Sequence, residues 1–162
     1  MSSVCVKRLS RAAALSLWLT LALSGCGGEA DTPEDRVRAL IGHMEESVEA
    51  GSIRQAADLL HDRYTDPRHQ SKSAAMRTLF GITRRHRGIH LFSLVRAVEL
   101  APQQDAATAV VFVGMTGVPV DSLEALISLK ADLYRFDLGL VEEDGDWRIL
   151  SSRWERVDPR ML

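Results

Sequence analysis

The stretch LYRFDLGLVEEDGDWRIL, residues 133–150, decides the fold of this chain. Apolar and polar side chains alternate through residues 133–142, and this period of two is typical of a β-strand. Asp144-Gly145 follows, and Asp-Gly between two such runs is the strongest short-range signal for a β-hairpin. Residues 146–157 then predict the returning strand. The stretch therefore predicts two long antiparallel strands at the end of the chain.

Two further strands are predicted upstream of this hairpin. Residues 89–100 alternate again, and a turn over residues 102–105 leads into residues 106–118. The second of these segments is apolar on both faces, which is typical of a central strand. Residues 119–130 form a connection longer than a hairpin turn, and we expect a short helix there that begins at Asp121 or Ser122.

The sequence pattern of residues 32–87 predicts helices. Thr32-Pro33-Glu34-Asp35 combines a capping threonine, a proline at the first helical position and acids in the first turn. Apolar residues recur at helical spacing up to Val48, and Gly51 ends the run. Ser52 is expected to cap a second helix that reaches Leu60, Asp66-Pro67 breaks the chain, and residues 71–87 predict a third helix.

Helices followed by strands joined with tight turns indicate an α+β domain, in which helices at the N-terminal end pack on a curved antiparallel sheet of about four long strands. This order resembles the nuclear transport factor 2-like family, also called SnoaL-like or cystatin-like. The resemblance is carried by Ala56-Ala57-Asp58-Leu59-Leu60 and by the closing hairpin, whose last strand opens with Asp146-Trp147-Arg148-Ile149. It implies a sheet that curls around a helix to form a cone, in a family that holds isomerases, dehydratases and many proteins without catalytic activity.

The first 25 residues indicate an export signal. Lys7, Arg8 and Arg11 are followed by an apolar run from Ala12 to Leu23, which is shorter than the roughly 20 residues of a membrane-spanning helix. The run closes with Leu23-Ser24-Gly25-Cys26, which resembles the lipobox of bacterial lipoproteins.

The lipobox resemblance implies lipidation of Cys26 and cleavage before it. Two or three acyl chains, palmitate among them, would anchor the chain firmly. We therefore expect three parts: residues 1–25 as a lipoprotein signal peptide, residues 26–34 as a lipidated tether, and residues 35–158 as the domain. The expected location is the cell envelope, at the outer membrane and facing the periplasm, because Gly27 replaces the aspartate that favours the inner membrane in enterobacterial lipoproteins. An uncleaved anchor or an ordinary signal with a chance cysteine is the alternative.

The composition of the chain argues against several classes of partner and chemistry. The formal net charge of −2 becomes more negative when the basic signal is removed, which argues against nucleic acid as a partner. Cys5 leaves with the signal and Cys26 takes lipid, so no thiol remains for a disulfide or a nucleophile. The histidines lack helical i, i+4 pairing, so no metal site is expected, and no motif predicts a cofactor.

Tyr64 and Asp66 are the candidate catalytic residues, because the resemblance puts polar groups near the mouth of the cone. Asp66 also precedes Pro67, so ordinary turn formation is the competing interpretation. His61 is expected at a helix end, where an imidazole interacts well with the helix dipole. His43 is expected at the edge of the apolar stripe of the first helix.

Charged strand residues are candidates for ligand binding, namely Arg96, Arg135, Asp137 and Arg153. Strict alternation puts Arg135 and Asp137 on the face opposite Tyr134 and Phe136. They then form either a surface ladder of cross-strand ion pairs or an anion site inside the cone.

Three arginines, Arg84, Arg85 and Arg87, cluster at the end of the third predicted helix. Interaction with the helix dipole explains them, and contact with anionic lipid headgroups is the functional alternative. Trp147 and Trp154 are seven residues apart on one strand, so we expect them on opposite faces, with Trp154 the candidate for ligand contact.

Two functions remain open from the sequence. The first is a lipid-anchored, non-catalytic domain that binds an envelope protein or a small apolar ligand. The second is an enzyme of the isomerase or dehydratase type that acts on a small apolar substrate in the cone. The resemblance also implies a possible homodimer through the outer sheet face.

Overall fold

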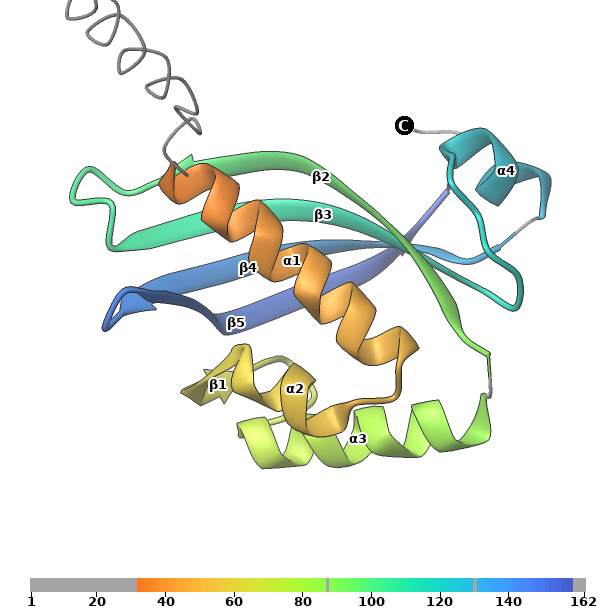
Figure 1. The fold of residues 1–162 in the computed structure, drawn as a ribbon, viewed down its shortest axis with the longest axis horizontal. Helices are drawn as coiled ribbons and strands as arrows, with labels where there is room; N and C mark the ends of the chain where they lie inside the picture. The colour runs from red at the N-terminus through yellow and green to blue at the C-terminus, as the bar shows by residue number, and fades with distance from the viewer. Residues whose placement is uncertain (1–31, 87, 130, 159–162) are drawn as a thin grey trace, which may run out of the picture. The chain divides into compact units, whose positions relative to one another are not determined.

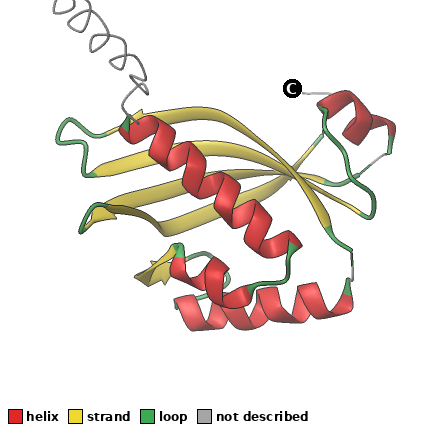
Figure 2. Cartoon of the chain, viewed as in Figure 1, coloured by secondary structure: helices red, strands yellow, loops and turns green. Residues whose placement is uncertain are grey.

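The structure is a computed structural model that describes residues 32–86, 88–129 and 131–158. It is an α+β domain in which a five-stranded sheet carries a long helix on one face, further helices beside one edge and a short helix near one end (Figures 1 and 2). The elements, in chain order, are α1 (Pro33–Glu49), α2 (Ile53–Asp58), β1 (Leu60–Thr65), α3 (Lys72–Arg85), β2 (His90–Leu100), β3 (Ala106–Thr116), α4 (Leu123–Ser128), β4 (Leu133–Glu143) and β5 (Asp146–Val157). The predicted fold class is confirmed.

Helices α1, α3 and α4 begin at side-chain caps. Ser52 precedes α2 as predicted, but its side chain makes no capping hydrogen bond. Thr32 Oγ1 accepts a hydrogen bond from the backbone N–H of Asp35 at 3.1 Å, and the Asp35 carboxylate accepts the backbone N–H of Thr32 at 3.2 Å. This reciprocal capping box satisfies two N–H groups that the helix cannot pair internally. Ser122 caps α4 with a single bond, in which its Oγ accepts the backbone N–H of Ala125 at 3.3 Å. None of the described helices has the length and apolar character that crossing a bilayer requires.

The closing hairpin has the predicted geometry. Asp144 has φ 55° and Gly145 has φ 86°, so both residues of the turn lie in the left-handed region. Such a turn matches the right-handed twist of the flanking strands. Strands β2, β3, β4 and β5 then follow one another as an antiparallel meander.

The fifth strand corrects the predicted sheet. The second helix was expected to reach Leu60, but α2 ends at Asp58, and β1 pairs in parallel with β5. The backbone N–H of Ile149 donates to the carbonyl of Leu59 at 3.0 Å. The sheet is therefore mixed, and the predicted place of His61 at a helix end is wrong: this residue lies in β1 and is buried.

The prediction that the two tryptophans lie on opposite faces is wrong, because β5 contains an extra residue. Leu140 pairs with Ile149 and Gly139 with Ser151, so Leu150 has no partner on β4. Such a β-bulge reverses the alternation of side chains beyond it. Trp147 and Trp154 therefore lie on the same face of the sheet, although strict alternation predicts opposite faces.

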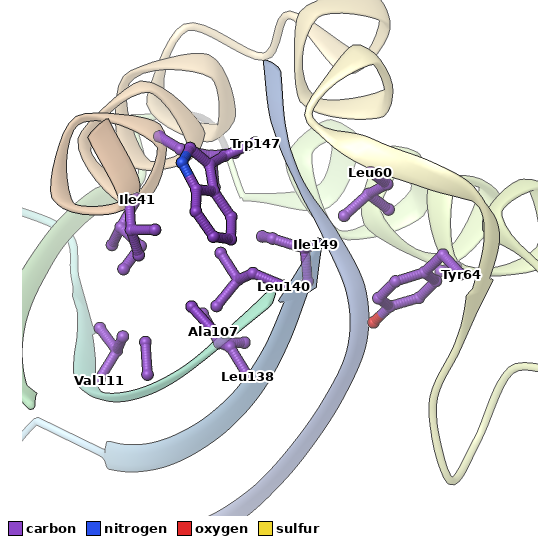
Figure 3. Close-up of a cluster of buried hydrophobic side chains, with 13 residues drawn as sticks. Ile41, Leu60, Tyr64, Ala107, Val111, Leu138, Leu140, Trp147 and Ile149 are labelled. Atoms are coloured by element: carbon purple, nitrogen blue, oxygen red, sulfur yellow. The ribbon is translucent and has the colours of Figure 1, made fainter. Parts of the chain in front are cut away.

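The core fills the space between α1 and the sheet. The curved strands surround Trp147, Leu140 and Val111, and Ile41 of α1 packs toward them (Figure 3). Every residue of this buried cluster falls between positions 37 and 149. A fragment that starts at Gly27 thus contains the whole core and is expected to fold by itself.

The opposite face of the sheet is covered locally by α4. Leu126 is fully buried, and a Cβ atom built on Gly114 would lie 2.5 Å from Leu126 Cδ1. Only a residue without a side chain fits there, so Gly114 lets the short helix pack closely against β3. Leu133 pairs with Gly114 across the strands and is also fully buried.

Leu126→Ala tests this second, smaller packing site. The substitution removes a fully buried side chain, which costs about 2–5 kcal/mol of the free energy of unfolding. Denaturant unfolding of the Gly27 fragment measures the loss. Ile127→Ala is the matched control, because Ile127 is exposed and its truncation should cost less than about 0.5 kcal/mol. Equal losses would contradict the packing described.

Candidate functional site

Tyr64 and Asp66 meet at the end of β1. The Tyr64 hydroxyl donates to Asp66 Oδ2 at 3.0 Å, and its oxygen lies 2.7 Å from Ser152 Oγ on β5. Because Tyr64 has one proton, the Ser152 hydroxyl is the donor to Tyr64. The two predicted residues are thus brought together and are joined to a strand almost ninety positions away along the chain.

Both oxygens of the Asp66 carboxylate accept hydrogen bonds from neighbouring groups. Oδ1 accepts the backbone N–H groups of Arg68 and His69, both at 2.8 Å, and Oδ2 lies 2.9 Å from His69 Nδ1. Its side chain is 1% exposed. Burial raises the pKa of Asp66, but the hydrogen bonds from His69, Arg68 and Tyr64 outweigh it, so the pKa is lowered. This geometry suits an Asx turn that holds the loop after β1, and it leaves no free lone pair for a substrate proton.

Tyr64 serves the same network as a donor. Burial raises its pKa to about 12; the hydrogen bond from Ser152 lowers it, and the charge of Asp66 raises it further. The phenol therefore keeps its proton throughout the neutral range. Its observed role is to link the loop after β1 to β5.

His69 connects this network to α3. Its Nε2 lies 2.9 Å from Thr78 Oγ1, while Nδ1 contacts Asp66. Sequence reasoning missed His69 and Ser152. The spacing of Asp66 and His69 is a local signal, since an Asp that opens a turn bonds to groups two and three residues later. No local pattern indicates Ser152, because the sheet register alone brings it to Tyr64.

An aromatic stack lies beside this network. The Phe136 and Trp154 rings are stacked, with their centroids 5.9 Å apart at 24°. The Arg68 guanidinium lies over the Trp154 ring, 5.3 Å from its centroid. Both aromatic side chains are half-buried and lie on the same sheet face as Ser152. Trp154, a predicted ligand residue, therefore offers partly open aromatic surface.

A second carboxyl group faces the sheet from α1. Ser93 on β2 donates a hydrogen bond to Glu45, which is partly buried. Burial raises the pKa of Glu45; the Ser93 bond lowers it, and the nearby charges of Glu49 and Glu46 raise it. Sequence reasoning missed Glu45, although it follows the buried Ile41 by four positions and so shares its helix face.

The predicted strand cluster lies elsewhere. Asp137 pairs in register with Arg153, and Arg135 Nη2 lies 2.8 Å from Asp137 Oδ1. These three residues are on the sheet face opposite Phe136 and Trp154, and the ion pair between Arg135 and Asp137 runs along β4 and not across the strands. Arg96 sits in a register shift of β2 and is exposed.

Other predicted residues lie away from the aromatic stack or outside the described part. Arg84 and Arg85 form the last turn of α3. Cys26 and Arg87 lie outside the described residues. His43 is exposed on α1, and no group of residues in the described ranges could hold a metal ion.

The comparisons identify the fold. No protein-family model matches the sequence, and no curated protein matches it. A cystatin-like domain of unknown function from Nostoc punctiforme has a TM-score of 0.59 at 16% identity, over 80% of this chain and 79% of that chain. A candidate scytalone dehydratase from Novosphingobium aromaticivorans has a TM-score of 0.60 at 12% identity, over 77% and 84%.

A third solved structure agrees with these two. A nuclear transport factor 2-like protein of unknown function from Shewanella oneidensis has a TM-score of 0.57 at 13% identity, over 76% of this chain and 98% of that chain. At this level of identity the likeness establishes the fold alone. The chain therefore has a cystatin-like, nuclear transport factor 2-like fold, as its sequence predicted.

Asp66→Asn tests the buried network. The amide cannot accept every bond of the carboxylate, so we expect a loss of about 1–3 kcal/mol in the free energy of unfolding at neutral pH. Because folding lowers the pKa of Asp66 from 3.8, its stabilisation is present above about pH 4 and is lost as pH falls through the folded pKa. The difference between wild type and variant should therefore shrink in acid. Asp58→Asn, at an exposed position of α2, is the control and should show no such trend.

Proposed function

We propose that this chain is a lipid-anchored cell-envelope protein whose domain binds a small apolar ligand, or an apolar side chain of a partner protein, at the Phe136–Trp154 stack. Support for the anchor comes from the run Leu23-Ser24-Gly25-Cys26 behind an apolar segment. The proposed location is the outer membrane, with the domain in the periplasm. The role is binding without chemistry.

The aromatic stack is the observation that carries the binding role. Aromatic rings supply a large contact area at small entropic cost, and ligand sites combine such apolar surface with a few placed polar groups. Arg68 over Trp154 and Ser152 on the same strand face are polar groups of this kind. A planar apolar ligand with a negative or hydrogen-bonding edge fits this surface best.

An enzyme of the isomerase or dehydratase type is the second candidate, and Glu45 favours it. A carboxyl group with a raised pKa on the helix that faces the sheet is a suitable acid or base. The two roles differ in what happens to a ligand recovered from the purified protein. If the domain only binds, the NMR spectrum of the recovered ligand stays unchanged when it is incubated again with the protein. If the domain is an enzyme, the spectrum changes as the ligand is converted.

Cys26→Ser in the full chain tests the anchor. Without the thiol no acyl chain is attached, so we expect the variant to lose labelling by radioactive palmitate and to leave the washed membrane fraction. Cys5→Ser is the matched control and should keep both the label and the membrane association, because Cys5 belongs to the cleaved segment. Membrane-bound, palmitate-labelled Cys26→Ser protein would refute the proposal.

Trp154→Ala tests the aromatic site. The probe is anilinonaphthalene sulfonate, an apolar fluorescent anion, titrated into the Gly27 fragment. Loss of one stacked ring should raise its dissociation constant about three- to tenfold, and Trp154→Phe should restore most of the affinity. Ile127→Ala truncates an exposed apolar side chain on α4 and is the control. Phe80→Ala tests the other exposed aromatic surface, on α3, and a loss of affinity confined to that variant would place the probe there and reject the site.

A further inference from the structure

Helix α3 carries charge of one sign. Its charged residues are Lys72, Arg77, Arg84 and Arg85, and it holds no acidic residue, although the chain as a whole has a formal net charge of −2. Positive charge is therefore concentrated on one element of a mildly acidic protein. Such a concentration of exposed charge attracts an anionic partner where the chain itself supplies no counter-charge.

Several arginines elsewhere in the domain have carboxylate partners. Arg36 pairs with Glu142 at 2.9 Å and Arg148 with Glu143 at 3.7 Å. Within residues 32–86, 88–129 and 131–158, by contrast, Arg77, Arg84 and Arg85 have no carboxylate partner, and all three are exposed. Their charge is available to something outside the chain.

An exposed aromatic residue lies among these cations. Phe80 is 48% exposed, and the Arg84 guanidinium lies over its ring, 5.5 Å from the centroid. Arg77, Phe80 and Arg84 follow at spacings of three and four, so they form one stripe along the helix. Interaction with the helix dipole accounts for cations in the last turn, but it does not account for Arg77 in the middle of the helix or for an exposed Phe80.

An open apolar groove of about 740 Å³ runs beside this stripe. Ile53 and Ala57 of α2 line it together with Met76 and Phe80 of α3. At its rim Lys72 Nζ contacts the carbonyl of Leu60 at 2.8 Å and Asp62 at 3.0 Å, so this lysine is already partnered. Arg77 thus stands next to apolar surface, and Asp62, which also lines the groove, is paired with Lys72.

We propose that Arg77, Phe80, Arg84 and Arg85, here called the α3 surface, bind the face of a bilayer that contains anionic phospholipids. Guanidinium groups form paired hydrogen bonds with phosphate oxygens. Arginine together with an aromatic ring is the composition of helices that lie in the headgroup region, with the ring in the acyl boundary. The adjoining groove gives an acyl chain or glycerol backbone an apolar surface to contact.

The proposal stands apart from lipidation of Cys26, because the surface belongs to the folded domain. A tether would strengthen its effect, since it makes the second contact intramolecular and raises the effective concentration of lipid around the domain. We therefore expect the free fragment to bind more weakly than the tethered chain, but measurably at low salt. The test uses the untethered fragment so that the two proposals fail separately.

The experiment is co-sedimentation of the Gly27 fragment with vesicles. We expect binding to phosphatidylcholine vesicles that contain phosphatidylglycerol, no binding to phosphatidylcholine alone, and loss of binding at high salt, where exposed charges are screened. Arg77→Glu with Arg84→Glu should weaken binding about tenfold or more. Arg96→Glu with Arg153→Glu changes the charge equally at two other exposed positions and should leave most of the binding.

Three results would overturn the proposal. They are equal binding to neutral vesicles, equal weakening by the two double variants, and binding that inorganic phosphate at low concentration abolishes, which would indicate a site for the free anion. Phe80→Ala adds a separate check, because it keeps the charge and should still weaken binding severalfold. Sedimentation of the fragment alone as a dimer that Phe80→Ala dissociates would assign the surface to a second copy of the chain.

Discussion

The extra residue Leu150 in β5 is the constraint on which the other features depend. Before it, Trp147 and Ile149 point to the core; after it, Ser152 and Trp154 point to the same side. Without the bulge, regular alternation would continue through Ser151, Arg153 and Glu155, and two charged side chains would face the helices. Burying them without partners costs more than any hydrogen bond that the bulge leaves unmade. The bulge therefore keeps Arg153 on the outer face and puts both tryptophans on the face toward the helices, where Trp147 is buried and Trp154 is half-buried.

At Trp147, the free energy gained by filling the core outweighs the cost of an unmade hydrogen bond. Trp147 is 5% exposed, and its indole N–H finds no acceptor within the described residues. An unmade hydrogen bond of this kind costs about 1–3 kcal/mol. The large ring offsets this by filling the space between α1 and the curved sheet, where a smaller residue would leave a cavity. Filling that space leaves the Phe136–Trp154 stack as the partly open aromatic surface on the same face.

Local chemistry made much of the fold predictable from the sequence. Asp144-Gly145 supplies two left-handed residues where a hairpin needs them, and Thr32 and Ser122 cap helices through side chains of their own. β1 was missed because it is six residues long and its partner lies about ninety positions later. The same limit applies to the site. The turn at Asp66 follows from Asp-Pro, whereas the contact with Ser152 follows only from the register of β5.

The loop between β1 and α3 links the proposed ligand site with the proposed membrane surface. Arg68 from this loop lies over Trp154, while His69 bonds to Thr78 on α3, one position after Arg77. Asp66 fixes both by accepting their backbone N–H groups. A shift of α3 on a bilayer would therefore move Arg68 relative to the Trp154 ring. A ligand that displaces Arg68 would in turn move the same loop. Coupling between the ligand site and the membrane surface is reciprocal. Its size is limited by how differently the ligand, or the membrane, binds the two conformations of the loop.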